Sequence, residues 1–303
     1  MATTNYLPDV LDTTEAERVA TGFIFTEGPL WHPDGFWYFV DIRQNKLFRM
    51  RIGEAPEVVR ATSGGNGTSF DLDGRLINCE GEGRRITRTN HDGSVEAIVS
   101  TFNGGRFNRP NDVICHSNGN LYFTDPDKRV PYLAREIPGP DGDGGLWDGA
   151  CVYRLTPRGD LSVLAYCEYP NGLAFSPDER TMYVANTRSS KYIHALRFDG
   201  DGKLTGRSIF ADMNDGDEPG IPDGLKVDVA GRVYCTGPGG IWVFSPDGAH
   251  VGIIRWPEQA VNFAFGGPDM RTLLCCAHTS VYTLRVKVPG NPHPWYRLHG
   301  IAS

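Results

Sequence analysis

The sequence has 303 residues, of which 40% are hydrophobic and 22% charged, the composition of an ordinary globular protein. Its formal net charge of −7 makes a nucleic-acid backbone or an anionic membrane an unfavourable partner. No segment approaches the roughly 20 apolar residues of a membrane-spanning helix, and the N-terminus lacks the basic and apolar regions of a secretory signal. We therefore expect a cytoplasmic protein with no nucleic-acid and no membrane partner.

A pattern recurs along the chain: a small polar residue, an apolar strand, a turn rich in Asp, Asn, Gly or Pro, and a second apolar strand. Its six copies span 27–41, 69–77, 111–125, 171–186, 223–234 and 262–274. Each copy predicts a β-hairpin, because these turn residues accept the positive φ angles of tight turns. A third apolar strand usually follows, as at 46–50, 152–155 and 241–248.

Four short strands repeated six times, at a spacing of roughly 40–60 residues, predict an all-β fold. We expect a six-bladed β-propeller with four-stranded antiparallel blades around a central metal-containing channel, and a β-sandwich is the alternative architecture. The prediction is one domain over 1–303, with blades from about 25 to 290 and the N-terminal segment closing the ring. The pattern allows only one short helical turn, at 13–20. The proline- and glycine-rich insertion 126–151 predicts a lid over the channel mouth.

The polar residue that opens five of the six copies is a candidate functional residue, because equivalent positions of a propeller converge on the central channel. The residues are Glu27, Asn111, Asn171, Asp223 and Asn262. Carboxylate and amide oxygens suit Ca²⁺, Mg²⁺ or Mn²⁺, and no His or Cys occupies an equivalent position. The alternative is that these residues only cap strand starts. The seven cysteines contain no C-x-x-C pair, so we expect buried free thiols.

Four motifs carry a resemblance to a known family: Thr-Glu-Gly-Pro-Leu-Trp at 26–31, Arg-Pro-Asn-Asp at 109–112, Pro-Asn-Gly-Leu-Ala-Phe-Ser-Pro-Asp at 170–178 and Pro-Asp-Gly at 222–224. They resemble the motifs of the gluconolactonase, senescence-marker-protein and luciferin-regenerating-enzyme family. The resemblance runs from about residue 25 to 288, with all six repeats in order.

The resemblance implies a set of site residues. Glu27, Asn171 and Asp223 match the family's ligands to one divalent metal ion, with Ca²⁺ expected first and Mg²⁺, Mn²⁺, Zn²⁺ or Fe²⁺ as alternatives. Arg109 and Asn111 match the residues that bind the hydroxyls and carbonyl of a sugar lactone. Asp223 doubles as the candidate catalytic base.

The implied activity is metal-dependent hydrolysis of an aldono-lactone to the aldonic acid, with D-glucono-1,5-lactone as the leading substrate. A divalent metal polarises the lactone carbonyl and a positioned carboxylate takes the proton of the attacking water. The alternatives are a calcium-binding regulatory or scaffold propeller, and a metal-dependent hydrolase of another lactone or a phosphotriester. We expect a small-molecule sugar lactone as the partner and a monomer or weak homodimer.

Overall fold

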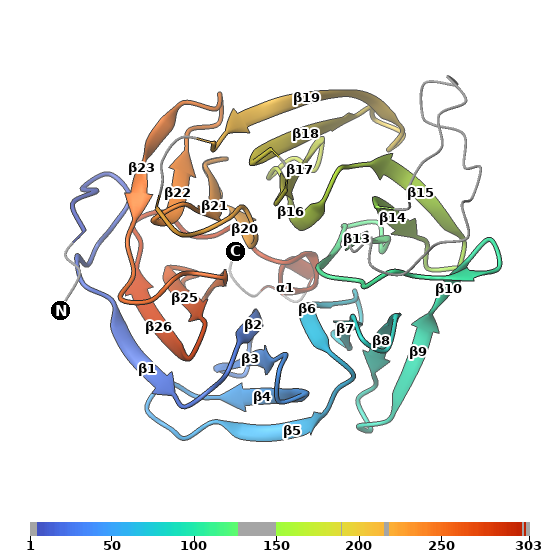
Figure 1. Ribbon diagram of the computed structural model, residues 1–303, viewed down its shortest axis with the longest axis horizontal. Helices are drawn as coiled ribbons and strands as arrows, with labels where there is room; N and C mark the ends of the chain where they lie inside the picture. The colour runs from blue at the N-terminus through green and yellow to red at the C-terminus, as the bar shows by residue number, and fades with distance from the viewer. Residues whose placement is uncertain (1–4, 127–149, 189, 215–217, 299, 301–303) are drawn as a thin grey trace.

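Six four-stranded antiparallel sheets stand in a ring around a central channel (Figure 1). The structure is a computed structural model that describes residues 5–126, 150–188, 190–214, 218–298 and 300. In five of the six sheets the strands pair in chain order from the channel outwards, because short turns join consecutive antiparallel strands. The predicted all-β, six-bladed propeller is confirmed.

The first five blades each use four consecutive strands of the chain. Blade 1 contains β2 (Thr26–His32), β3 (Phe36–Asp41), β4 (Lys46–Met50) and β5 (Glu57–Ala61). Blade 2 contains β6 (Gly65–Phe70), β7 (Leu76–Glu80), β8 (Arg85–Thr89) and β9 (Val95–Val99), and the small hairpin β10 (Thr101–Phe102) and β11 (Gly105–Arg106) follows it. Blade 3 contains β12 (Val113–Cys115), β13 (Leu121–Asp125), β14 (Cys151–Leu155) and β15 (Leu161–Tyr166). Blade 4 contains β16 (Pro170–Phe175), β17 (Thr181–Asn186), β18 (Tyr192–Phe198) and β19 (Leu204–Asp212), and blade 5 contains β20 (Leu225–Val227), β21 (Val233–Gly237), β22 (Gly240–Phe244) and β23 (His250–Ile254).

Blade 6 joins the two ends of the chain. It contains β24 (Asn262–Gly266), β25 (Thr272–Ala277) and β26 (Ser280–Arg285), and β1 (Glu17–Thr21) is its outer strand. β1 pairs antiparallel with β26, so the ring is closed by hydrogen bonds between N-terminal and C-terminal segments. The predicted helical turn at 13–20 is therefore wrong, because pairing with β26 draws this segment into an extended conformation.

The one α-helix of the described residues is α1 (Pro294–Leu298), which the periodicity did not predict because five residues are too short for a helical pattern. Among the described residues, no helix has the length and apolar character that a membrane crossing requires. The predicted lid, 126–151, lies almost entirely at 127–149, outside the described residues.

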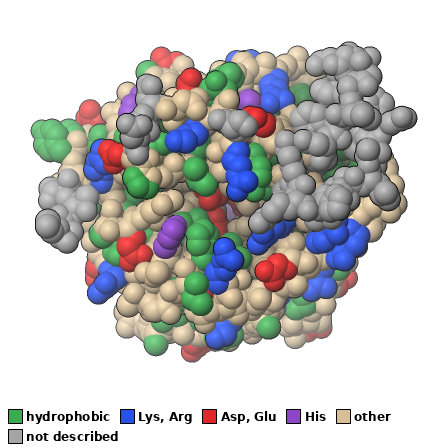
Figure 2. Space-filling model, viewed as in Figure 1, with side chains coloured by type: hydrophobic (Ala, Val, Ile, Leu, Met, Phe, Trp, Pro, Cys, Tyr) green, Lys and Arg blue, Asp and Glu red, His purple; other side chains and the backbone are tan. Residues whose placement is uncertain are grey.

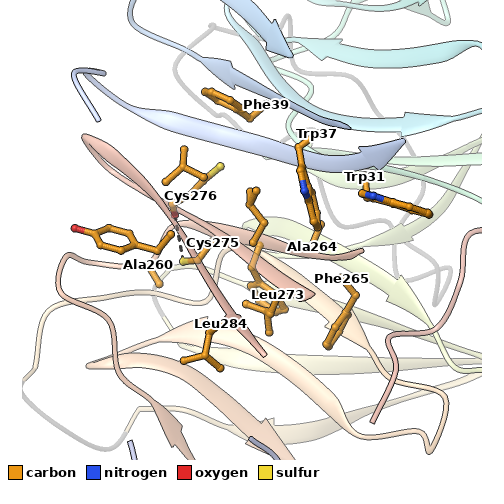
Figure 3. Packing of buried hydrophobic residues seen from close by; sticks show 14 of the residues in the cluster. Trp31, Trp37, Phe39, Ala260, Ala264, Phe265, Leu273, Cys275, Cys276 and Leu284 are labelled. Carbon is orange, nitrogen blue, oxygen red and sulfur yellow. Dashed lines mark hydrogen bonds between the residues drawn. The ribbon is translucent and has the colours of Figure 1, made fainter. Parts of the chain in front are cut away.

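The core between blades 6 and 1 shows how neighbouring sheets pack (Figure 3). Trp31 and Trp37 of blade 1 are 3% and 2% exposed and lie against Gly266 of blade 6. A Cβ on Gly266 would lie 2.4 Å from the Cβ of Trp31 and 2.4 Å from the Trp37 ring, so only glycine fits between the two indoles. The seven cysteines are all buried and free, as predicted, and Cys275 and Cys276 belong to this cluster.

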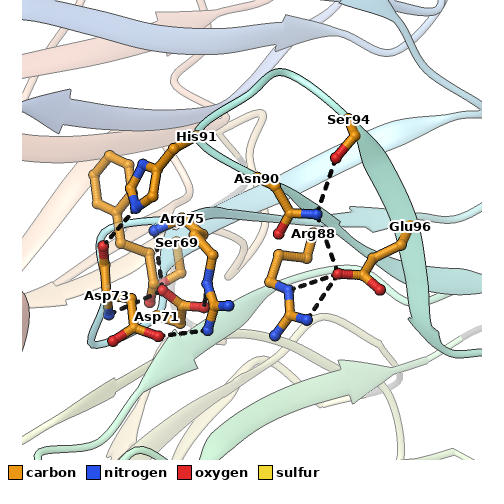
Figure 4. Close-up of polar contacts among 10 residues, drawn as sticks. Ser69, Asp71, Asp73, Arg75, Arg88, Asn90, His91, Ser94 and Glu96 are labelled. Atoms are coloured by element: carbon orange, nitrogen blue, oxygen red, sulfur yellow. Dashed lines mark hydrogen bonds and ion pairs between the residues drawn. The ribbon is translucent and has the colours of Figure 1, made fainter.

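Charged side chains of blade 2 pair locally (Figure 4). Arg75 lies 2.7 Å from Asp71 at the β6–β7 turn, and Arg88 lies 2.7 Å from Glu96 across β8 and β9. The side chain of Glu96 is 49% exposed, and pairs of this kind contribute about 0–1 kcal/mol to stability. They fix a turn and a strand pair of blade 2.

The C-terminal segment covers one end of the central channel. The Tyr296 hydroxyl donates a hydrogen bond to the Trp31 carbonyl, and the Trp295 ring lies 4.8 Å from that of Phe70. A cavity of about 140 Å³ lies between this segment and the inner strands. Substrate access to the channel is therefore expected at the opposite end, where the inner strands begin.

Candidate functional site

The polar residues that open the inner strands form a ring at this opposite end. Its members, one from each blade, are Glu27, Asn66, Asn111, Asn171, Asp223 and Asn262. In blades 1, 2 and 4 the ring residue lies where the register between the first two strands shifts. Such β-bulges redirect side chains and are common next to active sites. In the space-filling view, acidic side chains are visible in the hollow at the centre of the ring, and Lys and Arg side chains lie around it (Figure 2).

A glycine follows the ring residue in blades 1, 2, 4 and 5 because the next blade approaches closely there. The Gly172 N–H donates to the Asp223 carbonyl at 3.0 Å, and a Cβ on Gly172 would lie 2.1 Å from that oxygen. A Cβ on Gly224 would lie 2.2 Å from Oδ1 of Asn262. These glycines fix the distance between neighbouring ring residues, and therefore the size of the site.

Blade 3 has Asp112 where those four blades have glycine. Asp112 is 4% exposed, and its Oδ1 accepts a hydrogen bond of 2.9 Å from the Val113 N–H. Its Oδ2 is buried, has no hydrogen-bond partner, and lies 4.0 Å from Nζ of Lys226. Burial raises the pKa of Asp112, and the nearby Lys226 ammonium opposes this shift. A third carboxylate therefore faces the channel beside Glu27 and Asp223.

Glu27 is buried and in electrostatic contact with other carboxylates. Its Oε2 accepts a 2.8 Å hydrogen bond from Nδ2 of Asn262 and another from the Gly28 N–H. Loss of hydration and the charge of Asp112 together raise the pKa of Glu27 to about 7. A carboxylate with this pKa is partly protonated near neutral pH in the metal-free protein, so a cation would displace a proton on binding.

Asp223 lies next to Asn171 and is coupled to Glu27. Burial, followed by the charges of Glu27 and Asp112, raises the pKa of Asp223 well above its ordinary value, and a hydrogen bond from Asn171 opposes the shift. Nδ2 of Asn171 also donates to Oγ1 of Thr187 at 3.0 Å. A carboxylate only accepts hydrogen bonds, so both interactions use the amide N–H groups and leave Oδ1 of Asn171 available to a cation.

The donor set fits a hard divalent cation. Glu27 and Asp223 supply carboxylate oxygens and Asn171 supplies an amide oxygen, which are the ligands that Ca²⁺, Mg²⁺ and Mn²⁺ prefer. Within the described residues no group of three or more His, Cys, Asp or Glu side chains is arranged around a metal position, so the amide is an essential part of the candidate set. A bound cation would also relieve the repulsion that raises the pKa of both carboxylates.

Arg109 and Asn111 lie on the loop that leads into β12. The buried carboxylate of Asp125 accepts hydrogen bonds from the N–H groups of Asn108 and Arg109, at 2.8 Å and 2.5 Å. The Asn111 N–H donates to the Thr124 carbonyl at 2.9 Å. These contacts fix the backbone of the loop that carries both predicted substrate-binding residues.

Comparison with known proteins identifies the family. Residues 25–279 match the model of the SMP-30/Gluconolactonase/LRE-like region. The chain belongs to this family.

Among its relatives, a gluconolactonase of Zymomonas mobilis is 31% identical over 94% of this chain and 85% of its own length. A pentonolactonase of Haloferax volcanii is 30% identical over 86% of this chain and 84% of its own. The solved structure of a gluconolactonase from Xanthomonas campestris superposes with a TM-score of 0.79, at 31% identity, over 94% of this chain and 95% of that one.

The structure places Glu27, Asn111, Asn171 and Asp223 of this family member at one end of the channel and Arg109 on the loop that leads into β12. It also adds four residues that the sequence analysis did not assign. They are Asn66, Asp112, Thr187 and Lys226. Asn66 could have been found by counting back from Gly67, which aligns with the glycines of blades 1, 4 and 5. Asp112 could have been found as an acidic residue at the position where four other blades have glycine. Nothing in the local sequence marks Thr187 or Lys226, because Thr187 bonds both Asn171 of its own blade and Pro222 of the next, and Lys226 contacts Asp112 and Asn262 of other blades.

Proposed function

We propose that the chain is a sugar-lactone hydrolase that uses one divalent cation, held by Glu27, Asn171 and Asp223. The observation that carries the proposal is the convergence of these oxygen donors in one channel, with the pKa of both carboxylates raised by burial and mutual repulsion. Buried carboxylates whose pKa values are raised by mutual repulsion are found mostly at cation-binding and catalytic sites. The names of the relatives from Zymomonas mobilis and Haloferax volcanii support a sugar lactone as the substrate class.

Each residue has a distinct proposed task. A bound divalent cation would polarise the lactone carbonyl and stabilise the oxyanion that develops on it. Asp223 takes the proton of the attacking water, and positioned bases of this kind contribute about 10²–10⁴-fold to the rate. Asn262 orients Glu27 through the bond to Oε2. Arg109 and Asn111 bind the hydroxyls and carbonyl of the sugar.

The leading substrate is D-glucono-1,5-lactone and the leading ion is Ca²⁺, with Mg²⁺, Mn²⁺, Zn²⁺ or Fe²⁺ as alternatives. A pentono-lactone is the nearest competing substrate. A single-domain organisation over 1–303, a cytoplasmic location and a monomeric or weakly dimeric state belong to the same proposal.

The test of the residue roles is Asp223→Asn, which keeps the shape of the side chain and removes its charge. We expect turnover of D-glucono-1,5-lactone to fall at least about 100-fold, with an unchanged circular dichroism spectrum. Asp201→Asn, at an exposed turn of blade 4, is the matched control and keeps full activity. Near-normal turnover of Asp223→Asn would contradict the proposal.

A further inference from the structure

Lys226 places an ammonium group inside the central channel. It lies on β20, the inner strand of blade 5 that begins just after the candidate ligand Asp223. Its Nζ donates to the Leu225 carbonyl at 3.0 Å and lies 3.5 Å from Oδ1 of Asn262. It lies 4.0 Å from Oδ2 of Asp112, which has no hydrogen-bond partner. The side chain is only 24% exposed, and it lines the 140 Å³ cavity between the inner strands and the C-terminal segment.

Three carboxylates share the channel with this one ammonium. Lys226 lowers the pKa of each of them, Glu27, Asp112 and Asp223, against the larger effect of burial. Its positive charge is therefore felt across the whole candidate site and not only by Asp112. An ammonium has no lone pair, so Lys226 cannot itself bind a metal ion.

We propose that Lys226 is a fixed counter-cation of the candidate metal site, which holds the three carboxylates together without metal and keeps the divalent cation weakly bound. This inference rests on the metal site proposed above. With all groups ionised, three carboxylates, one ammonium and one divalent ion sum to zero charge. Without Lys226 the metal-free site carries one further negative charge, and a divalent ion would bind without a neighbouring positive charge.

A purely structural role predicts something different. If Lys226 only neutralised Asp112, its loss would disturb the channel and weaken both the fold and metal binding. A counter-cation role predicts opposite signs: the metal-free protein becomes less stable, because like charges repel, while the metal-bound protein becomes relatively more stable. The effect on metal affinity should reach about tenfold or more in a poorly hydrated channel.

The test uses Lys226→Met, which keeps most of the side-chain length, together with Asp112→Asn and the double variant. Lys203→Met, in an exposed turn of blade 4, is the matched control. Each protein is treated with EDTA, dialysed, and titrated by calorimetry with CaCl₂ and with MnCl₂ at pH 8.5, where fewer protons compete with the cation than at neutral pH. Thermal unfolding is followed with EDTA and with Ca²⁺.

We expect Lys226→Met to bind Ca²⁺ about tenfold more tightly, Asp112→Asn to bind it more weakly, and the double variant to return towards the wild type. In EDTA, Lys226→Met should have a lower melting temperature than the wild type. Addition of Ca²⁺ should raise the melting temperature of Lys226→Met by more than it raises that of the wild type. Unchanged or weaker affinity in a folded Lys226→Met protein would overturn the inference while leaving the metal site intact. If the wild type bound neither ion, the metal site and this inference would both be wrong. If Lys226→Met did not fold, Lys226→Gln would take its place. Tighter Ca²⁺ binding by Lys226→Gln and weaker Ca²⁺ binding by Asp112→Asn would support the inference, and any other pair of changes would overturn it.

Discussion

Replacing Gly172 by alanine tests whether the spacing between blades sets the geometry of the site. The new Cβ would lie 2.1 Å from the Asp223 carbonyl oxygen, whereas real Cβ contacts essentially never fall below 3.0 Å, so blades 4 and 5 must separate by about 0.9 Å. Overpacking of this kind costs about 1–3 kcal/mol of stability. The separation also strains the 3.0 Å hydrogen bond between Gly172 and Asp223. Because displacements of about 1 Å can cost 100-fold in rate, we expect kcat/KM to fall by about that factor.

The assay compares lactone hydrolysis, followed with a pH indicator, and thermal unfolding of the wild type, Gly172→Ala and a control. Gly206→Ala is the control, because Gly206 lies in β19 without a positive φ, and a Cβ added there would have no neighbouring atom within 4 Å. The control should change stability by less than about 0.5 kcal/mol and keep full activity. A Gly172→Ala protein with normal stability and normal kcat/KM would refute the claim that blade contacts set the ligand spacing.

Three further predictions concern particular contacts. Because the pKa of Glu27 is raised from 4.5 to about 7, the metal-free protein should lose stability as pH rises through this range. A melting temperature in EDTA that stays constant or rises with pH would contradict this prediction. Asp125→Asn should raise KM more than it lowers kcat, because the carboxylate holds the N–H groups of Asn108 and Arg109; steady-state kinetics with an unchanged KM would count against it. Tyr296→Phe should lower the free energy of unfolding by about 1 kcal/mol and leave turnover unchanged, because the hydroxyl donates to the Trp31 carbonyl, away from the ring of polar residues. Denaturant titration measures the change in stability and steady-state kinetics measures turnover. A loss of activity would contradict the prediction.

The fold could be predicted from the sequence because each blade repeats the same local pattern. Apolar alternation and turn residues such as Asp34-Gly35 and Asn118-Gly119 mark every hairpin within a few residues. The sequence analysis expected the N-terminal segment to close the ring but did not predict the strand β1, because residues 17–21 become a strand only by pairing with β26. The same holds for α1, whose conformation depends on packing against the ends of the inner strands.

The candidate site was predictable where a residue carries a signal in its own repeat. Glu27, Asn171 and Asp223 occupy equivalent positions, so the repeat places them together without any knowledge of distances. Lys226 and Thr187 carry no such signal, because their importance comes from contacts with Asp112, Asn262 and Pro222 in other blades. Contacts across blades depend on how far neighbouring sheets separate, which a single sequence does not report.

The most direct test of the central claim is metal-restored lactone hydrolysis. The protein is treated with EDTA, and Ca²⁺, Mg²⁺, Mn²⁺, Zn²⁺ or Fe²⁺ is added back singly, with glucono-, galactono-, xylono- and arabinono-lactones beside a simple aryl ester and with spontaneous hydrolysis subtracted. We predict that EDTA abolishes hydrolysis of the sugar lactones, that a divalent ion restores it, and that the aryl ester is a poor substrate. Full activity on sugar lactones after complete metal removal, or no activity with any ion, would contradict the account.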